Sequence, residues 1–514
     1  MKTFLSIIFI FIVGVVLYSL ILRGIYSNPQ GSSIKNNLDQ ATKPFELSPE
    51  RGRYILTMSL AENRSFALSR QLADAADPDV GYHEGRFYIF FPPGVSVLAL
   101  PFYNLGKNYN LSQVGSFFTI AIFAILNLIL IFKIARDIFK LPFSISLISS
   151  IIFGFASTSW SYAITLYQHH VTTFAILSIF YSAYLFKKAK KWNWIFAGYN
   201  WFVYGMALFL DYPNLFLLAP AMLYFLINSF FYSVKSKEIT VGLKKQILIT
   251  SALFIGSILL HGYYNQINFG SWKKVSGSLA GIRRVKEQEK LKNLNKDKAL
   301  AEISSKKDVT GFFKEEDLPH GFAILLFSRD RGLFLYAPIF VLALLGIYSI
   351  RKRINLEIGI LLGLVGINLL LYSSWGDPWG GWAYGSRYLI PSMAVLSIFV
   401  GIWLNNARHK ITASFATFLL FAYSSFIALL GALTTNQVPP KVEADFLKMK
   451  YNFLLNWDYF IDGKSGSFVF NEFASKYMNL QQYFLLIYTP LILIVFALIF
   501  IVPLFENIKQ KANF

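Results

Sequence analysis

Long apolar runs alternate with short polar segments along the whole chain. The runs are roughly 15 to 23 residues long and free of charge, the length of a helix that crosses a hydrocarbon core of about 30 Å. The pattern predicts an all-α polytopic membrane protein with about twelve transmembrane helices. The expected spans are Phe4–Leu22, Gly115–Phe132, Phe143–Trp160, Val171–Phe186, Trp192–Leu210, Asn214–Tyr232, Ile247–Leu260, Leu333–Ile350, Ile358–Tyr372, Tyr388–Leu404, Ile411–Leu433 and Tyr483–Phe505.

Basic residues follow every second apolar run and set the expected orientation. Lys2 precedes the first run, and Lys/Arg clusters follow the even-numbered runs, ending with Lys509 and Lys511. Because cytoplasmic loops of membrane proteins are enriched in Lys and Arg, both termini are expected in the cytoplasm. Residues 1–505 then form one transmembrane domain, followed by a cytoplasmic tail at 506–514. Its long outer loops are 23–111, 261–330 and 434–482.

Two of these outer loops carry helical patterns of their own. Residues Arg51 to Ala76 have helical periodicity and are expected to form one helix lying on the membrane surface. Pro93 to Gly106 is apolar but too short to span, which indicates a second interfacial helix. The Lys- and Glu-rich stretch Arg283 to Lys307 predicts a solvated amphipathic helix.

Composition supports the membrane assignment and excludes several kinds of site. The chain has 514 residues, of which 55% are hydrophobic and 15% charged, whereas soluble proteins average roughly a quarter charged. It has no cysteine, which excludes disulfides and thiolate metal sites. The net charge of +20 is what basic cytoplasmic loops produce, so it does not indicate nucleic-acid binding.

The predicted topology places most of the polar chemistry on the outer side. Carboxylates and guanidiniums at membrane depth are costly and tend to mark substrate paths, so we expect one water-facing cavity at the outer leaflet. The candidates there are Glu50, Arg53, Asp77, Asp79, Arg86, Gln168, His169, Asp211, Arg329, Arg331, Arg387 and Tyr388. Arg387 follows a glycine-rich loop at the membrane edge, where a guanidinium can form paired bonds to a phosphate.

Several of these residues also have a plain structural interpretation. Asp211 could be a helix-terminal residue that faces headgroups, and His169 is more simply an interfacial residue than a metal ligand. Arg329 and Arg331 could bind headgroup phosphates or an anionic ligand. By spacing alone, Glu50 is an acid near a helix N-terminus that stabilises the helix dipole. The outer carboxylates could hold a divalent ion, but no ligand spacing demands a metal or another cofactor.

Three motifs in the outer segments resemble a known family. They are Pro49-Glu50-x-x-Arg53-Tyr54, then Gly85-Arg86-x-Tyr88 with Pro92-Pro93, and Gly385-Ser-Arg387-Tyr388-Leu-x-Pro391. Their order and shared sidedness resemble the GT-C superfamily of membrane glycosyltransferases. Within it, they look like the branch of the dolichyl-phosphate-mannose protein mannosyltransferases and the lipid A aminoarabinose transferases.

The resemblance implies a GT-C-like fold and an inverting transfer from a polyprenyl-phosphate sugar in the outer leaflet of the cytoplasmic membrane. It implies Glu50 as the catalytic base, with Asp77 and Asp79 as fallback acids, and an acceptor that is a glycan, a lipid or a protein. A lysine often precedes the Pro-Pro pair in the aminoarabinose transferases, but Phe91 stands there in this chain. The residues expected to bind the donor phosphate and the substrate, from the resemblance and the topology together, are Arg53, Tyr54, Arg86, Tyr88, Gln168, His169, Asp211, Arg329, Arg331, Arg387 and Tyr388.

Two other functions remain open at this point. A transporter or flippase of lipid-linked saccharides would place polar residues at mid-span, often in broken helices, whereas the spans here are nearly free of charge. A polymerase or ligase that uses a lipid-linked donor would share the layout, and the long outer loop His261 to Asp330 could serve its large acceptor.

Overall fold

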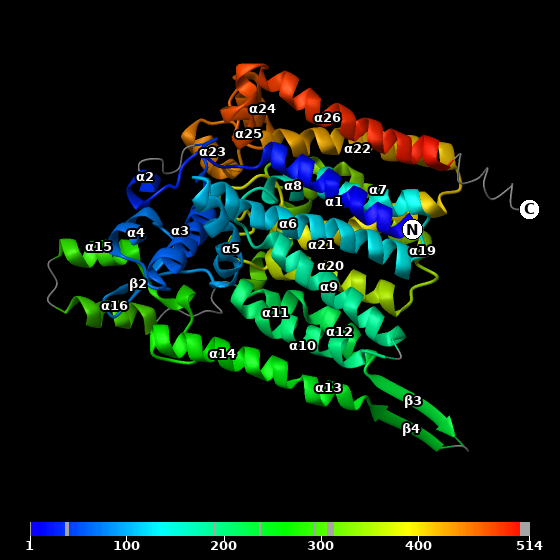
Figure 1. Ribbon diagram of the computed structural model, residues 1–514, viewed down its shortest axis with the longest axis horizontal. Coiled ribbons are helices and arrows are strands. Elements are labelled where there is room, and N and C mark those ends of the chain that lie inside the picture. Colours follow the sequence, from blue (N-terminus) through cyan, green and yellow to red (C-terminus); the bar gives the residue numbers. More distant parts are fainter. Residues whose placement is uncertain are drawn as a thin grey trace, which may run out of the picture.

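The protein is a bundle of long helices with a layer of short elements at one end (Figure 1). The computed structural model describes residues 2–35, 41–189, 191–235, 238–291, 295–305 and 313–503. The expected tail at 506–514, with Lys509 and Lys511, lies outside these residues. The helices of the bundle are α1 (Lys2–Ile21), α6 (Ser112–Lys133), α7 (Phe143–Phe155), α9 (His169–Lys188), α10 (Asn193–Leu210), α12 (Ala219–Ile227), α13 (Lys245–Thr250) with α14 (Ala252–Phe269), α19 (Val341–Ile350), α20 (Leu356–Ser373), α21 (Ile390–Asn406), α22 (Lys410–Leu433) and α26 (Leu480–Phe496).

These helices occupy all the positions at which the sequence predicts a span. In the described part of the chain, seven helices are long and apolar enough to cross a membrane. Three further predicted spans correspond to shorter apolar helices at Phe143–Phe155, Asn214–Ile227 and Pro338–Ile350. The other two correspond to α9 and α10, with 20 and 18 residues. The chain is a multi-pass, all-α membrane protein.

Helix α21 forms the centre of the bundle. It packs against α7, α9, α19 and α20 and is buried along nearly its whole length. Small residues permit this close packing: a Cβ at Gly346 of α19 would collide with the carbonyl oxygen of Phe399 on α21. Residues 387–389, which precede α21 as a single 3-10 turn, are therefore attached to a rigid element.

The first loop that the sequence predicts to lie outside, residues 23–111, forms most of the layer at the end of the bundle. It contains α2 (Gly31–Lys35), α3 (Ser48–Asn63), α4 (Arg70–Ala75), the hairpin β1 (Val80–His83) and β2 (Arg86–Ile89), and α5 (Gly94–Asn108). Strand β5 (Ala280–Gly281), from the second long outer loop, pairs with β1 and joins the two loops. Helices α15 (Ile282–Lys290) and α16 (Lys296–Ser305) follow β5.

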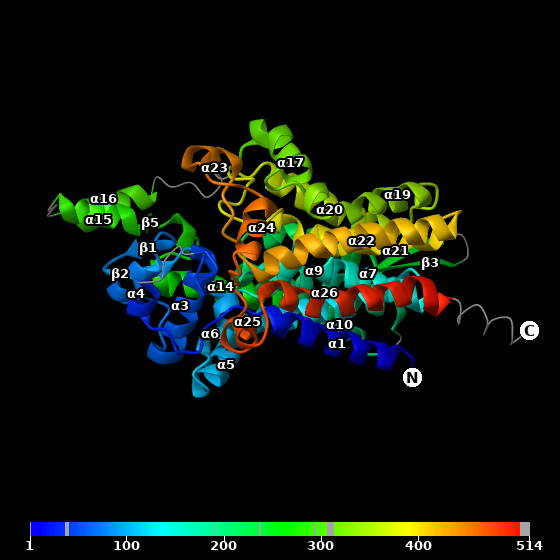
Figure 2. The same ribbon diagram turned by 90° about the horizontal axis from the view of Figure 1, so that it is seen from above.

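Figure 2 shows α3, α4, α15 and α16 at the end of the bundle opposite the N-terminus of α1. The remaining short helices are α8 (Ser159–Tyr162), α11 (Asn214–Leu217), α17 (Leu318–Phe327), α18 (Leu333–Tyr336), α23 (Lys441–Leu447), α24 (Phe453–Ile461) and α25 (Phe468–Glu472). At the far end, the hairpin of β3 (Phe230–Lys235) and β4 (Glu238–Leu243) extends from the bundle (Figure 1).

The prediction of one surface helix from Arg51 to Ala76 is wrong in two ways. The helix ends at Asn63, because Arg64 adopts a left-handed conformation and its N–H bonds back to the carbonyl of Ser59. The following segment is extended enough for Leu68 to bond to Phe87 of β2, and α4 begins only at Arg70. Residues 50–59 of α3 are moreover buried on all sides, so this part of the helix does not lie on a surface.

Other boundaries differ by a turn or more. The sixth predicted span ends at Ile227, because residues 230–235 turn into β3. The seventh continues to Phe269, so His261 and Asn265 belong to α14 rather than to a loop. The Lys- and Glu-rich stretch forms two helices, α15 and α16, instead of one; residues 292–294, 306 and 307 of this stretch lie outside the described chain.

Candidate active site

A cavity of about 720 Å³ opens where the outer layer meets the bundle. Its walls come from α3, the segment before and after the β1–β2 hairpin, the starts of α9 and α11, the segment before β5, and the residues around the end of α20 and the start of α21. Seven of the residues that the sequence predicts for a site line it: Arg53, Asp79, Gln168, His169, Asp211, Arg387 and Tyr388. Their sequence separation spans most of the chain, so the fold brings them together.

Arg387 faces this cavity from the 3-10 turn before α21. Its guanidinium carbon lies 5.2 Å from the ring centre of Tyr167 and 5.5 Å from that of Tyr388. Tyr388 is in turn stacked on Tyr372 with ring centres 4.2 Å apart, which fixes its orientation. The Nε atom of Arg387 is buried and has no hydrogen-bond partner among the described residues. An arginine held by aromatic rings with an open N–H is arranged to take an oxyanion.

Arg53 approaches the cavity from α3. It donates to the carbonyl of Pro49 at 3.2 Å and to Oε1 of Gln168 at 2.8 Å, and its guanidinium lies 4.3 Å from the ring centre of Phe91. Burial lowers the pKa of Arg53 to about 10, and Asp211 opposes the shift. The group therefore stays charged at neutral pH. The ring of Phe91 supports this arginine.

Gln168 connects Arg53 to Asp211. Its amide nitrogen donates to Oδ2 of Asp211 at 2.9 Å while its oxygen accepts from Arg53. Asp211 stands at the C-terminal end of α10 in an extended conformation, which turns its side chain away from the helix axis. Burial raises the pKa of the Asp211 carboxyl, and the guanidinium of Arg53 opposes the shift. The three residues form a fixed polar wall across the cavity.

Asp79 lies on the cavity wall contributed by the first outer loop. The hairpin holds its backbone, because the N–H of Phe90 donates to the Asp79 carbonyl at 3.0 Å directly beside the β1–β2 pairing. Burial raises the pKa of the Asp79 carboxyl, with the Ser48 hydroxyl and then Arg53 opposing the shift. Oδ2 is buried without a hydrogen-bond partner in the described residues. One carboxylate oxygen is thus available to accept a proton.

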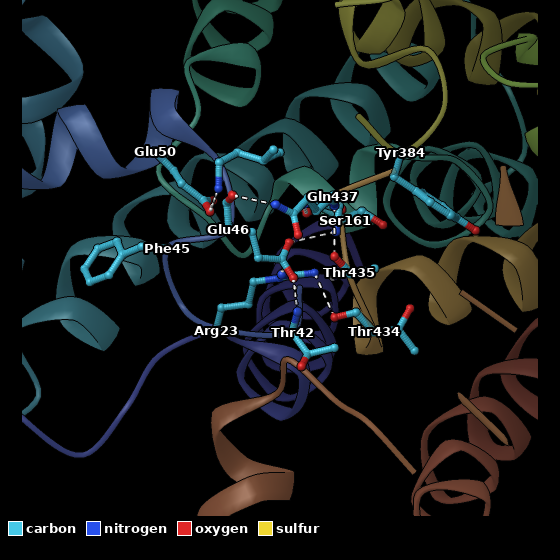
Figure 3. A network of polar contacts seen from close by, with 12 residues as sticks. Arg23, Thr42, Phe45, Glu46, Glu50, Ser161, Tyr384, Thr434, Thr435 and Gln437 are labelled. Carbon is cyan, nitrogen blue, oxygen red and sulfur yellow. Dashed lines mark hydrogen bonds and ion pairs between the residues drawn. The ribbon is translucent and has the colours of Figure 1, made fainter. Parts of the chain in front are cut away.

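Glu50, the base that the resemblance implies, does not line the cavity. It is 1% exposed, and its Oε1 accepts a hydrogen bond from the N–H of Leu47 at 3.2 Å, as a helix-capping residue does. Figure 3 shows it beside the buried pair of Arg23 and Glu46. Burial raises the pKa of Glu50 to about 8, and the nearby Glu46 carboxylate adds to the shift. The geometry matches the helix-start interpretation of this acid.

The other predicted residues also lie away from the cavity wall. Asp77 forms ion pairs with Lys286 at 2.7 Å and with Arg283 at 3.6 Å, which attaches α15 to the first outer loop. Tyr54 and Tyr88 are buried in packing, against Tyr103 and Phe269 respectively. Arg86 and Arg329 are exposed.

Arg331 is fully buried and donates to four backbone carbonyls, so its predicted role as an anion ligand is not supported by its geometry. A guanidinium with its nitrogens committed in this way has little left to offer a ligand.

Sequence reasoning missed the aromatic side chains that orient the charged groups. Tyr167 lies beneath both arginines, with Arg53 at 6.0 Å from its ring centre, and it stacks on His169 at 5.8 Å with an angle of 11°. Phe91 and Tyr372 support Arg53 and Tyr388 in the same way. In the sequence these rings resemble the many other aromatic residues of the chain. The only local signals are that Tyr167 precedes Gln168 and that Phe91 precedes the Pro-Pro pair.

The described residues contain no group of three or more His, Asp or Glu side chains that could hold a metal ion. Besides four tyrosines and one tryptophan, the polar side chains that line the cavity are two guanidiniums, two carboxylates, an amide and an imidazole. Together they can bind a phosphate group, and an available carboxylate can accept a proton from a hydroxyl next to it.

Comparison with known proteins gave structural neighbours only. No family model matches the chain, and no curated protein matches it. The solved structures that resemble it include ArnT from Cupriavidus metallidurans bound to undecaprenyl phosphate, with 10% identity, a TM-score of 0.47, and coverage of 96% of this chain and 76% of that one.

Two further neighbours are oligosaccharyltransferases of Archaeoglobus fulgidus. The apo form matches with 12% identity and a TM-score of 0.45 over 86% of this chain. AglB in complex with an inhibitory peptide and a dolichol-phosphate matches with 13% identity and a TM-score of 0.43 over 78% of this chain. The present chain spans only 57% and 53% of these two proteins.

Proposed function

We propose that this protein is a GT-C-type glycosyltransferase that moves a sugar from a polyprenyl-phosphate donor to an acceptor hydroxyl, at the outer face of the cytoplasmic membrane. The observation that carries the proposal is the cavity in which Arg53 and Arg387 stand near one aromatic ring and opposite two carboxylates. Asp79 and Asp211 offset the charge of the two guanidiniums, but Arg387 keeps a buried Nε–H without a hydrogen-bond partner among the described residues. The phosphate of a lipid that enters from the bilayer supplies an oxygen to accept from it.

The reaction needs one base and one site for negative charge. The acceptor oxygen attacks the anomeric carbon, the bond from that carbon to the phosphate oxygen breaks, and its electron pair stays on the phosphate. Arg387 and Arg53 stabilise the charge that develops there. The acceptor's proton passes to the carboxylate of Asp79, whose Oδ2 has no hydrogen-bond partner among the described residues. Its raised pKa makes this carboxylate a stronger base than an ordinary aspartate. The lipid phosphate is a good leaving group, so no general acid is required.

Asp79 takes the place that the sequence motif gave to Glu50. Both acids belong to the first outer loop, but Asp79 faces the cavity and Glu50 faces the interior. Asp211 holds Gln168 and Arg53 in place rather than serving as the base, because its carboxylate already accepts hydrogen bonds from Gln168 and from the N–H of Tyr212.

The test is binding of undecaprenyl phosphate, the lipid bound to ArnT, to the purified protein in lipid nanodiscs by native mass spectrometry. We expect the wild type to bind it and Arg387→Ala to bind it about tenfold more weakly, as loss of a charge-assisted contact predicts. The exposed Arg329, changed to Ala, is the matched control and should bind as the wild type does. Absence of wild-type binding would overturn the proposal. Mass spectrometry of the cell envelope with and without the protein then identifies the acceptor.

A further inference from the structure

Arg331 connects three segments of backbone through one guanidinium. Its Nε donates to the carbonyl of Trp379 at 3.0 Å, NH1 to that of Asp330 at 2.8 Å, and NH2 to those of Gly381 and Val438 at 2.9 Å each. The side chain is completely buried and is not part of the cavity wall. These bonds cross 48 to 107 residues of sequence, apart from the one to its neighbour Asp330.

The segment that Arg331 holds leads directly to Arg387. Residues 374–386 join α20 to the 3-10 turn, and Gly380, Gly381 and Gly385 in it have φ angles of 71°, 60° and 63°. Such glycines give a loop many alternative conformations unless other contacts fix it. Arg331 fixes this one in the middle, at Trp379 and Gly381, and at its end, because its own carbonyl also accepts a hydrogen bond from the hydroxyl of Ser386, the residue before Arg387.

The third segment ties the same arginine to the first outer loop. The Val438 carbonyl that accepts from Arg331 also accepts from the N–H of Ala383 at 2.9 Å. Two residues before Val438, the N–H of Asn436 donates to Glu46 at 2.9 Å. Glu46 also forms a buried ion pair with Arg23 at 2.5 Å (Figure 3). Glu46 lies two residues before the start of α3, which carries Arg53.

We infer that Arg331 is a positioning residue that fixes the direction of Arg387 and its separation from Arg53, and so sets the affinity of the cavity for a lipid phosphate. This inference rests on the proposed function. Arg331 contacts no ligand itself. Two guanidiniums can bind one phosphate together only if the segment before Arg387 and the segment before α3 keep a fixed relative position. The contacts from Glu46 through residues 436–438 to Arg331 fix that position. In catalysis, a displacement of about 1 Å in a positioned group can lower the reaction rate about a hundredfold.

Arginine is required at this position for its shape as well as its charge. Its planar fork supplies five donors in fixed directions, of which four bonds to carbonyls are made here. A lysine keeps the positive charge but has a single ammonium that cannot reach Trp379, Gly381 and Val438 together. The variant Arg331→Lys therefore changes the geometry of the loop without removing the charge.

The test is a double-mutant cycle on binding of undecaprenyl phosphate in nanodiscs. The proteins are the wild type, Arg331→Lys, Arg387→Ala and the double variant, with Arg329→Lys as the matched control two residues away. We expect Arg331→Lys to weaken binding about tenfold in the wild-type background and less than twofold when Arg387 is absent. Arg329→Lys should leave binding unchanged. The melting temperature of each protein is recorded alongside.

The outcomes are distinguishable. If the wild type does not bind the lipid, the proposed function fails. If the wild type binds and Arg387→Ala weakens binding, but Arg331→Lys matches the wild type, the inference alone fails. An equal loss with and without Arg387 would show a general structural effect and would also overturn the inference.

Should Arg331→Lys fail to fold, Ser386→Ala replaces it in the same cycle. This variant removes the hydroxyl that donates to the carbonyls of Arg331 and Leu325 and leaves the guanidinium bonds intact. We expect about a threefold loss that again depends on Arg387. An Arg387-independent loss, or none, would overturn the inference.

Discussion

Glu50 and Asp79 are two acids of one outer loop with different surroundings. Burial raises the pKa of both, and both lie near arginines. Glu50 sits at the start of α3 with its side chain turned back onto the N–H of Leu47, whereas Asp79 precedes a β-hairpin and lines the cavity. The difference shows that a raised pKa does not identify a base by itself. The surface that the carboxylate faces decides what it can do.

The largest expected effect is that of Asp79→Asn, which should lower the rate of sugar transfer about 10²- to 10⁴-fold. The amide keeps the size of the side chain but cannot accept the acceptor's proton. Because the pKa of Asp79 is raised, the wild-type rate should increase with pH through a midpoint above the ordinary value for an aspartate. The measurement is consumption of the lipid-linked donor by the purified protein as a function of pH.

Asp77→Asn is the control for this variant. Asp77 is two residues away and pairs with Lys286, so its loss should change transfer only slightly. A large loss for Asp77→Asn together with full activity for Asp79→Asn would reverse the roles of the two acids.

An intermediate effect is expected for Arg53→Lys. Arg53 is one turn from Glu50 on α3, but it lines the cavity whereas Glu50 does not. The two residues therefore compare the cavity with the protein interior on one helix. A lysine cannot bond to Pro49, Gln168 and a phosphate at once, and we expect about tenfold weaker binding of undecaprenyl phosphate. The exposed Arg86, changed to Lys, provides the comparison and should bind normally. Equal affinities for Arg53→Lys and the wild type would remove Arg53 from the phosphate site.

The smallest effect on activity is expected for Glu50→Gln, which should transfer sugar within about twofold of the wild type. Glutamine preserves the capping oxygen that accepts from Leu47. A loss as large as that of Asp79→Asn would restore the assignment that the sequence motif implies.

The same variant should alter the dependence of stability on pH. Burial raises the pKa of Glu50 to about 8, so the folded protein binds this proton more tightly than the unfolded chain does. Its contribution to stability is complete below roughly pH 4.5 and is lost as pH rises toward 8. Thermal unfolding should show the wild-type melting temperature falling over this window and Glu50→Gln reducing the fall. Parallel curves would contradict the buried, protonated state.

The sequence predicted the positions of the spans, because an apolar run depends on local composition. Each apolar run predicts its own helix, and the basic clusters predict the side of the membrane on which each loop lies. Arg387 and Asp211 could be identified in this way, since each stands at the edge of a span. The helix predicted across Arg51 to Ala76 failed because Leu68 pairs with Phe87, a contact that no local period encodes.

The sequence could not separate residues that lie close together but face different ways. Arg329 and Arg331 look equivalent in the chain, yet one is exposed and the other bonds to Val438, 107 residues away. The direction of a loop side chain follows from long-range backbone hydrogen bonds, which become visible only in the folded structure.

The most direct measurement is mass spectrometry of the cell envelope in a strain that lacks this protein and is complemented with either Asp79→Asn or Glu50→Gln. The lipid-phosphate mechanism with Asp79 as base predicts that Glu50→Gln restores the missing sugar modification and Asp79→Asn does not, although both proteins reach the membrane in equal amounts. Restoration by Asp79→Asn and failure of Glu50→Gln would contradict it.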